Sequence, residues 1–132
     1  MNLPTQAALA RYGAVKVTTS SPGALLVLLY DGLLRYVREA QSAMVAKDRA
    51  RAGERIGRAQ AILRELASTL NAQQSPELCA RLQGLYLFCG GHLLRANIEQ
   101  NPEKIAEVER LLAPLRDAWA QAVAKVASSA GK

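Results

Sequence analysis

The chain has 132 residues, of which 50% are hydrophobic and 5% aromatic, and its formal net charge is +6. This length suits one domain with a single two-layer core, and the abundance of Ala, Leu, Arg and Gln is typical of helices. No stretch of about 20 uncharged apolar residues occurs, so we expect no membrane-spanning helix. The first residues lack a basic segment followed by an apolar core, so we expect no secretory signal.

The first part of the chain, residues 1–20, shows no helical periodicity and contains several polar or β-branched residues. Its one strand-like feature is a short alternation of apolar and polar residues from Ala14 to Thr18. Strand signals are otherwise almost absent from the sequence. We therefore expect residues 1–20 to form an arm outside the core.

Three helix starts are marked in nearly the same way, at Ser21-Pro22, Ser75-Pro76 and Asn101-Pro102. In each, a side chain that can accept a hydrogen bond from a free helix-start amide precedes a proline at the first helical position. Glu77 and Glu103 follow the second and third prolines, where the positive end of a helix favours a carboxylate. These signals divide the chain and predict a bundle of helices.

Apolar residues recur at three- and four-residue steps over four segments, about 22–46, 50–70, 76–100 and 102–127. Short turns join these segments, so we expect consecutive helices to run antiparallel. The predicted fold is an all-α, antiparallel up-down four-helix bundle over residues 21–127, with an extended N-terminal arm (1–20) and a disordered tail (128–132). Pro114 falls inside the last segment, where it either bends the helix or breaks it.

The sequence lacks the residue clusters that catalysis or metal binding requires. His92 is the one histidine, for which we expect a hydrogen-bonded structural role, and no cysteine–histidine cluster has metal-ligand spacing. No phosphate-binding glycine loop and no nucleophile elbow occur. Cys79 and Cys89 are about 15 Å apart along one predicted helix, too far for a disulfide. We predict a protein of the bacterial cytosol that is not an enzyme and holds no metal or cofactor.

The predicted helix over 76–100 is apolar on two opposite faces. One face carries a core stripe of Leu78, Leu82, Leu85, Cys89, Leu93 and Ala96. The opposite face carries Ala80, Gly84, Leu87, Gly91, Leu94 and Ile98, and Leu28 points away from the core of the first helix. A helix that is apolar on two sides must be covered on both. We therefore predict that these residues form a groove for an amphipathic peptide. A compatible alternative is that the arm or a wide core covers this face.

These motifs resemble those of a known family in their order and spacing. Toward the N-terminus lie the runs Tyr12-Gly-Ala-Val15-Lys-Val17, Ser21-Pro22 with Leu25-Leu26, and Leu29-Tyr30-Asp31-Gly32. Further on lie Leu85-Tyr86, Leu94 and Ala96-Asn97, followed by Glu107-Val108, Leu111-Leu112 and Ala118-Trp119. The first group resembles the N-terminal tyrosine, the Ser-Pro helix start and the Leu-(Tyr/Phe)-Asp-Gly run of the flagellin-specific export chaperones of the FliS family. The other runs resemble the third and fourth helices of that family.

The resemblance implies a cytosolic, non-enzymatic chaperone of the flagellar type III secretion route. Such a chaperone would bind the disordered C-terminal segment of newly made flagellin and prevent its premature polymerisation. The client segment would fold into helices around the outside of the bundle, and the complex would be presented to the cytosolic domain of the export gate. The arm, with Tyr12, Val15 and Val17 as its cap residues, would occupy part of the groove when no client is bound. A homodimer of the free protein is an open alternative.

Two other functions are compatible with parts of the sequence. Arg51, Arg55 and Arg58 flank the core stripe of the second predicted helix, an arrangement that suits a basic nucleic-acid-binding bundle. However, Glu54 and Glu65 interrupt that surface, and no exposed set of aromatic residues offers base stacking. We therefore expect no nucleic-acid partner and no membrane insertion. The second alternative is a helical adaptor for an unrelated partner.

Overall fold

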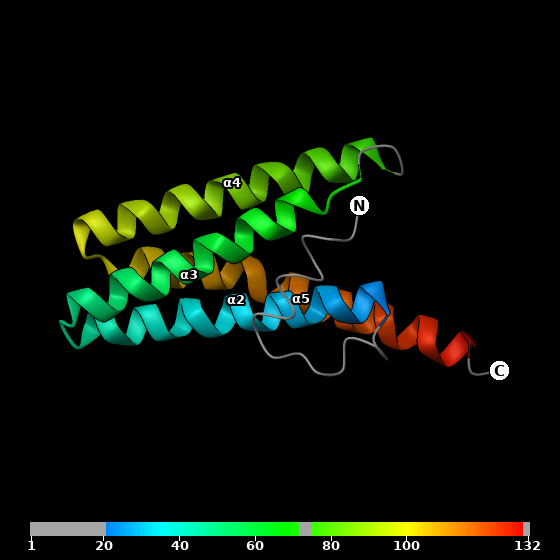
Figure 1. The fold of residues 1–132 in the computed structure, drawn as a ribbon, viewed down its shortest axis with the longest axis horizontal. Helices are drawn as coiled ribbons and strands as arrows, with labels where there is room; N and C mark the ends of the chain where they lie inside the picture. Colours follow the sequence, from blue (N-terminus) through cyan, green and yellow to red (C-terminus); the bar gives the residue numbers. More distant parts are fainter. Residues whose placement is uncertain (1–20, 72–74, 131–132) are drawn as a thin grey trace.

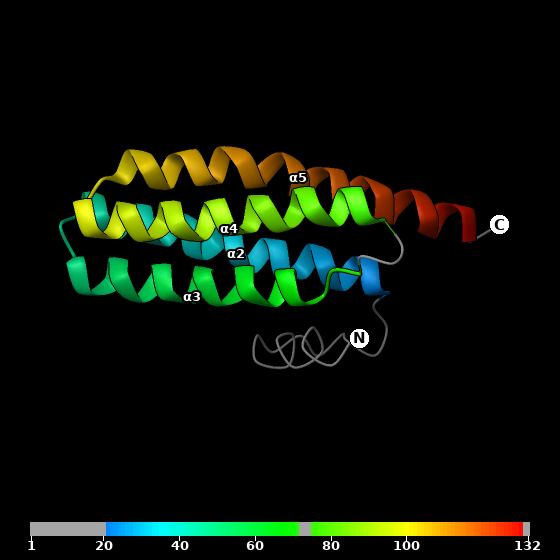
Figure 2. The ribbon, with the colours of Figure 1, turned by 90° about the horizontal axis from the view of Figure 1, so that it is seen from above.

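The structure, a computed structural model, describes residues 21–71 and 75–130. They form four helices, α2 (Pro22–Val45), α3 (Arg49–Ser68), α4 (Pro76–Glu99) and α5 (Pro102–Ala130). The helices run alternately up and down, as Figures 1 and 2 show. The predicted all-α, up-down four-helix bundle is therefore confirmed. The expected arm (1–20), with Tyr12, Val15 and Val17, lies outside the described residues.

The core runs along the inner faces of all four helices. Side chains with almost no exposed surface come from each of them: Tyr30, Leu29, Leu33 and Val37 from α2, Ile62 and Leu66 from α3, Cys89 and Leu93 from α4, and Ile105, Val108 and Leu112 from α5. Most of these residues stand at the three- and four-residue steps that predicted the helices. Within the described residues, no helix is long and apolar enough to cross a membrane.

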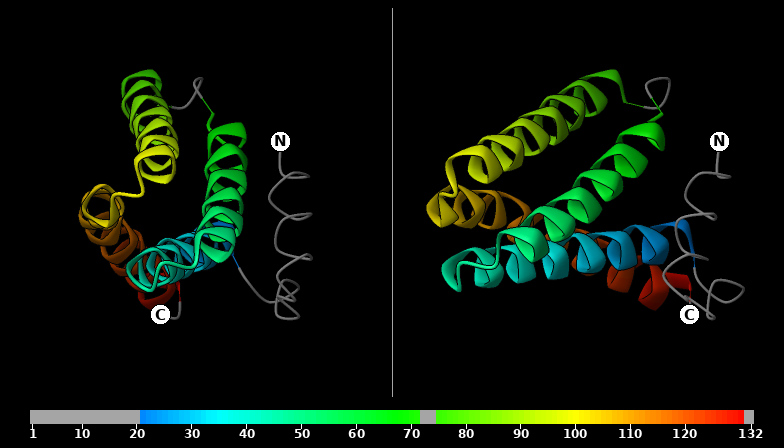
Figure 3. Two further views of the ribbon diagram at one scale, coloured as in Figure 1. Left: turned by 90° about the vertical axis from the view of Figure 1, so that its left-hand side faces the viewer. Right: turned by 60° about the vertical axis from the view of Figure 1, so that its left-hand side comes forward.

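Helix α4 packs less closely against its neighbours than the other three helices do. Contacts of α2 with α3 and with α5 are more extensive than the contacts of α4 with either neighbour. In the end-on view of Figure 3, α2 lies between α3 and α5, whereas α4 stands apart from α2 across the bundle. This uneven packing leaves room along the α3–α4 side.

The helix starts behave as predicted at two of the three marked positions. Ser21 Oγ accepts a hydrogen bond of 3.1 Å from the Ala24 amide, and Asn101 Oδ1 accepts one of 3.0 Å from the Glu103 amide. The expected cap at Ser75 is wrong, because its side chain makes no such bond. Ser75 has φ −155°, whereas the capping residues Ser21 and Asp48 have φ −72° and −92°, so the Ser75 backbone does not aim its side-chain oxygen at the free amides.

Asp48 provides a helix cap that the sequence analysis did not identify. Its carboxylate accepts a hydrogen bond of 3.1 Å from the Arg51 amide, so α3 begins at Arg49. The preceding residue, Lys47, has φ 65° and turns the chain out of α2. Its amide bonds to the Met44 carbonyl at 3.0 Å, and the Asp48 amide bonds to Ala43 at 2.8 Å. Two adjacent residues therefore end one helix and begin the next.

The last helix is continuous through Pro114 and ends at Ala130. Pro114 therefore does not split α5, and of the two expected outcomes the break is wrong. The expected boundary at 127 is also too early, because the helix continues over Ser128, Ser129 and Ala130. After Pro114, no glycine or proline occurs in the helix up to Ala130.

The two Ser-Pro helix starts allow a matched test of capping. Ser21→Ala should lower the free energy of unfolding by about 1 kcal/mol, because it removes a capping hydrogen bond. Ser75→Ala should change it little, since the Ser75 side chain makes no cap bond. Chemical denaturation followed by circular dichroism measures both. Equal losses in the two variants would contradict the assigned caps.

Candidate functional site

The outer face of α4 is exposed along most of its length. Leu87, Leu94 and Ile98 have 71%, 51% and 73% of their surface accessible. Ala80 and Gly84 are also exposed, and Gly91 is half-buried. The expectation that this face lies opposite the core is therefore met by the structure. The assignment of these residues to client binding stays a prediction.

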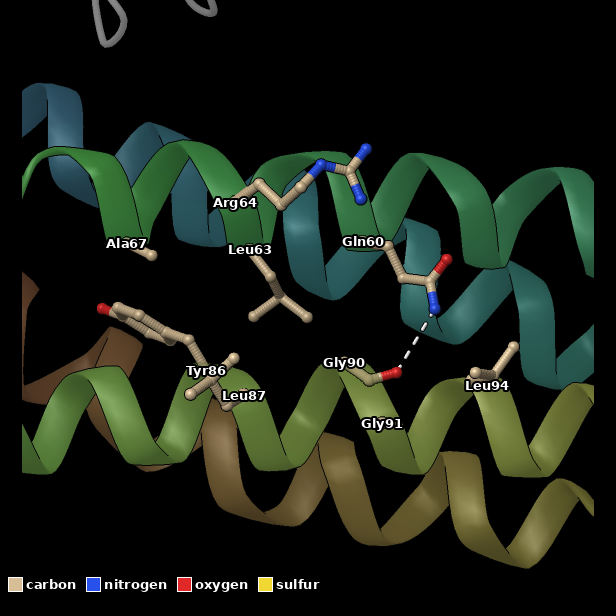
Figure 4. A pocket seen from close by; sticks show the side chains of 9 residues that line it. All are labelled: Gln60, Leu63, Arg64, Ala67, Tyr86, Leu87, Gly90, Gly91 and Leu94. Carbon is tan, nitrogen blue, oxygen red and sulfur yellow. Dashed lines mark hydrogen bonds between the residues drawn. The ribbon is translucent and has the colours of Figure 1, made fainter.

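A groove of about 430 Å³ lies between α3 and α4 (Figure 4). Its lining consists of Gln60, Leu63, Arg64 and Ala67 from α3, and Tyr86, Leu87, Gly90, Gly91 and Leu94 from α4. Leu63 and Tyr86 are buried and form part of the lining. Gln60 Nε2 donates a hydrogen bond of 3.2 Å to the Gly90 carbonyl, which ties the two helices together. The groove is thus mostly apolar, with a polar bridge and one arginine.

The structure brings together only part of the predicted set. Leu87, Gly91 and Leu94 line the groove, while Ala80, Gly84 and Ile98 continue the same face of α4 beyond it. Leu28 is exposed at 40% but lies on α2, which packs mainly against α3 and α5. The assignment of Leu28 to client binding stays a prediction.

The α3 side of the groove was missed by the sequence analysis. Leu63 belongs to the core stripe of α3, and its place in the groove becomes visible only when α3 and α4 are set side by side. Gln60, Arg64 and Ala67 follow it at helical spacing. No local signal distinguishes them from ordinary residues at the edge of a stripe.

A second hollow of about 210 Å³ lies beside the start of α4. Leu26, Thr69, Leu70, Asn71, Ser75, Leu78, Cys79, Leu82, Tyr86 and Trp119 line it. Leu78 was predicted to be in the core, but 45% of its surface is exposed. That prediction is wrong because this hollow leaves the first turns of α4 without close cover. Tyr86 lines both hollows and separates them.

A pair of buried tyrosines joins α2 to α4 at this point. The hydroxyl oxygens of Tyr30 and Tyr86 lie 2.7 Å apart and share a hydrogen bond. The Trp119 ring of α5 stands edge-on to Tyr30, with ring centroids 6.5 Å apart. Burial raises the pKa of Tyr30 and of Tyr86 above the ordinary tyrosine value. Both groups are therefore neutral at physiological pH, and the pair fixes the wall between the two hollows.

The single histidine has the structural role that was expected. His92 is buried, its Nε2 lies 2.5 Å from Glu107 Oε1, and its ring stacks on Phe88 at 5.0 Å. The bond to His92 lowers the pKa of Glu107 below its usual value. Within the described residues, no group of three or more side chains could hold a metal ion. The pair therefore links α4 to α5 and does not resemble a catalytic site.

The arginines that suggested nucleic-acid binding are largely paired with carboxylates. Arg55 contacts Glu39 at 3.1 Å and Glu54 at 3.0 Å, and Arg58 contacts Glu54 at 3.0 Å. An arginine that already has a carboxylate partner offers less charge to a phosphate. This pairing weighs against the predicted arginine cluster as a nucleic-acid surface.

The sequence as a whole matches a known family. The pattern of the family described as "Flagellar protein FliS" matches residues 5–126, nearly the full chain. The chain belongs to the FliS family. FliS is a family of flagellar chaperones and not a family of enzymes.

Individual FliS relatives cover most of this chain. The "Flagellar secretion chaperone FliS" of Bacillus subtilis is 38% identical over 85% of this chain and 83% of its own length. The protein of that name from Campylobacter jejuni is 32% identical over 82% of this chain and 84% of its own length. The protein of the same name from Salmonella typhimurium is 30% identical over 80% of this chain and 78% of its own length. The similarity therefore extends across the whole bundle.

The Leu29–Gly32 run that suggested the FliS family has a visible role in the bundle. Tyr30 is the buried partner of Tyr86. The carboxylate of the next residue, Asp31, accepts a hydrogen bond of 2.7 Å from Arg116 of α5. One short run of this FliS chain thus connects α2 to both of the helices that carry the family's later motifs.

Proposed function

We propose that this FliS-family chain binds the disordered C-terminal segment of flagellin in the bacterial cytosol. By covering that segment it prevents premature polymerisation, and it delivers the complex to the cytosolic domain of the flagellar export gate. Family membership supports the chaperone role. The observation that carries the binding role is the exposed apolar face of α4, at Leu87, Leu94 and Ile98, beside the α3–α4 groove.

An apolar surface of this kind suits an amphipathic helix. Contiguous exposed apolar patches on a single domain commonly mark a binding site, and a helix can lay its apolar side into a groove between two others. A disordered client that folds on the groove covers the surface that the bundle leaves open. We further propose that the arm, through Tyr12, Val15 and Val17, covers part of this surface in the free protein.

Calorimetry with a synthetic flagellin C-terminal peptide tests the proposal. Titrations at several temperatures should show binding with a large negative heat-capacity change, since coupled folding and binding typically buries about 1,000–3,000 Å². A peptide of the same composition in scrambled order is the control and should not bind. No binding of the native peptide, or a heat-capacity change near zero, would overturn the proposed function.

A further inference from the structure

The exposed face of α4 has the spacing of a coiled-coil seam. Its residues are Ala80, Gly84, Leu87, Gly91, Leu94 and Ile98, which alternate steps of four and three residues. Such alternation is the pattern that one helix shows to a second helix along a shared contact. Within the described residues no helix covers it, because Leu87 and Ile98 are almost three-quarters exposed. The seam is therefore shaped for a helix from another chain.

Glycines alternate with leucines along this seam, and packing within the chain does not explain them. A Cβ atom at Gly84 or Gly91 would meet no atom within 4 Å. At Gly23 of α2, by contrast, a Cβ atom would lie 2.8 Å from Val123 Cγ2, so packing within the fold disfavours a side chain there. Glycine inside a helix weakens it relative to alanine. Gly84 and Gly91 thus leave two notches, one before Leu87 and one between Leu87 and Leu94, at a cost to the stability of the helix.

Unpaired positive charge lies on both sides of the seam. Arg64 lines the groove on the α3 side, and Arg95 follows Gly91 by one helical turn. Neither forms an ion pair within residues 21–71 and 75–130. On the opposite side of the bundle, Arg38 pairs with Glu109 at 2.6 Å and Arg116 with Asp31 at 2.7 Å. The groove side therefore complements a partner that carries carboxylates.

We propose that the segment seated on this face is an amphipathic helix whose bulky apolar residues, spaced seven apart, fill the notches at Gly84 and Gly91. Carboxylates on its two flanks pair with Arg64 and Arg95. This inference rests on the proposed function, because it describes the client that the same site selects. Alternation of large and small residues across the contact allows the two helices to interdigitate.

Filling a notch should act on stability and on binding in opposite directions. Gly91→Ala should raise the midpoint of thermal unfolding by a few degrees, because alanine is the better helix former and meets no atom. The same change should weaken binding of the flagellin C-terminal peptide about tenfold, and Gly84→Ala combined with it should weaken binding further. Ser42→Ala, an exposed position on α2, is the control that should leave affinity unchanged. Unchanged affinity in the double glycine variant would overturn the notch assignment.

Reversing the charges of Arg64 and Arg95 tests whether these residues pair with carboxylates of the bound helix. Arg64→Glu with Arg95→Glu should weaken binding about tenfold or more at low salt, and added salt should reduce the difference from wild type. Arg49→Glu with Arg51→Glu makes the same change in net charge at the far end of α3 and should bind like wild type. Equal affinity of the two charge-reversed proteins would overturn the charge assignment.

Two designed peptides separate this inference from the proposed function. Both are helices of about three heptads with leucine at the seam positions, one with glutamate and one with lysine on the flanks. The wild-type protein should bind the glutamate peptide and not the lysine peptide. If it does so but fails to bind the flagellin peptide, the flagellin assignment is wrong and the seam assignment holds. If it binds flagellin but treats the designed peptides alike, the charge selection is wrong.

Discussion

Leu94→Asp should leave the bundle folded and remove most of its affinity for the flagellin segment, whereas Leu93→Asp should unfold it. The two residues are neighbours on α4, but Leu93 has 0% of its surface exposed and Leu94 has 51%. A buried, unpaired carboxylate costs several kcal/mol, a large share of the roughly 5–15 kcal/mol that stabilises a domain. At Leu94 the carboxylate stays in water in the free protein and is buried only when a client covers it.

Thermal melts followed by circular dichroism, together with calorimetry, measure both effects. The Leu94→Asp protein should melt cooperatively and bind the flagellin peptide at least about a hundredfold more weakly. Leu94→Ala is the milder companion and should lose less affinity. A Leu94→Asp protein that melts as early as Leu93→Asp would show that the outer face of α4 belongs to the core.

Replacing one member of the Tyr30–Tyr86 pair should destabilise the protein more than its small size suggests. Tyr30→Phe leaves the buried Tyr86 hydroxyl without its partner at 2.7 Å, and such an orphaned group costs about 1–3 kcal/mol. The double variant Tyr30→Phe/Tyr86→Phe removes both hydroxyls, so its loss should be smaller than the sum of the single losses. Urea denaturation of the four proteins measures this coupling. Additive losses would show that the hydroxyls do not depend on each other.

The same pair should make stability sensitive to alkaline pH. Burial raises the pKa of both hydroxyls in the folded state, so the folded protein holds these protons more tightly than the unfolded chain does. The resulting stabilisation is complete below the unfolded tyrosine pKa of about 10 and is lost as pH rises toward the folded values. The double phenylalanine variant should lose this part of the pH dependence.

The fold was predictable because several local signals agreed. Proline at the first helical position and the acceptor before it marked α2, α4 and α5, and the three- and four-residue apolar steps marked these helices and α3. The exceptions depended on geometry that residue type does not specify. Ser75 has a side chain that can cap a helix, but its backbone angles do not aim the oxygen at the free amides. Leu78 continues the apolar stripe of α4, but no neighbouring helix covers α4 closely at that point.

The candidate groove was predictable on one side only. Periodicity placed Leu87 and Leu94 opposite the core of α4, because that inference needs only one helix. The α3 contribution, from Gln60 to Ala67, depends on how far α3 and α4 stand apart, and the sequence of a single helix does not contain that distance.

The free arginines beside the groove also bear on how copies of this protein treat one another. Without flanking charges, the exposed leucine seam of α4 would tend to associate with the same seam of a second copy, since identical surfaces can pair about a twofold axis. If the two helices ran parallel in such a pair, Arg81 and Arg95, which directly follow seam positions 80 and 94, would face the same arginines of the second copy. Like charges that face each other across a contact destabilise it, whereas a helix that carries carboxylates would bind favourably between these arginines. The arginine border would thus disfavour pairing of this face with a second copy of the same chain.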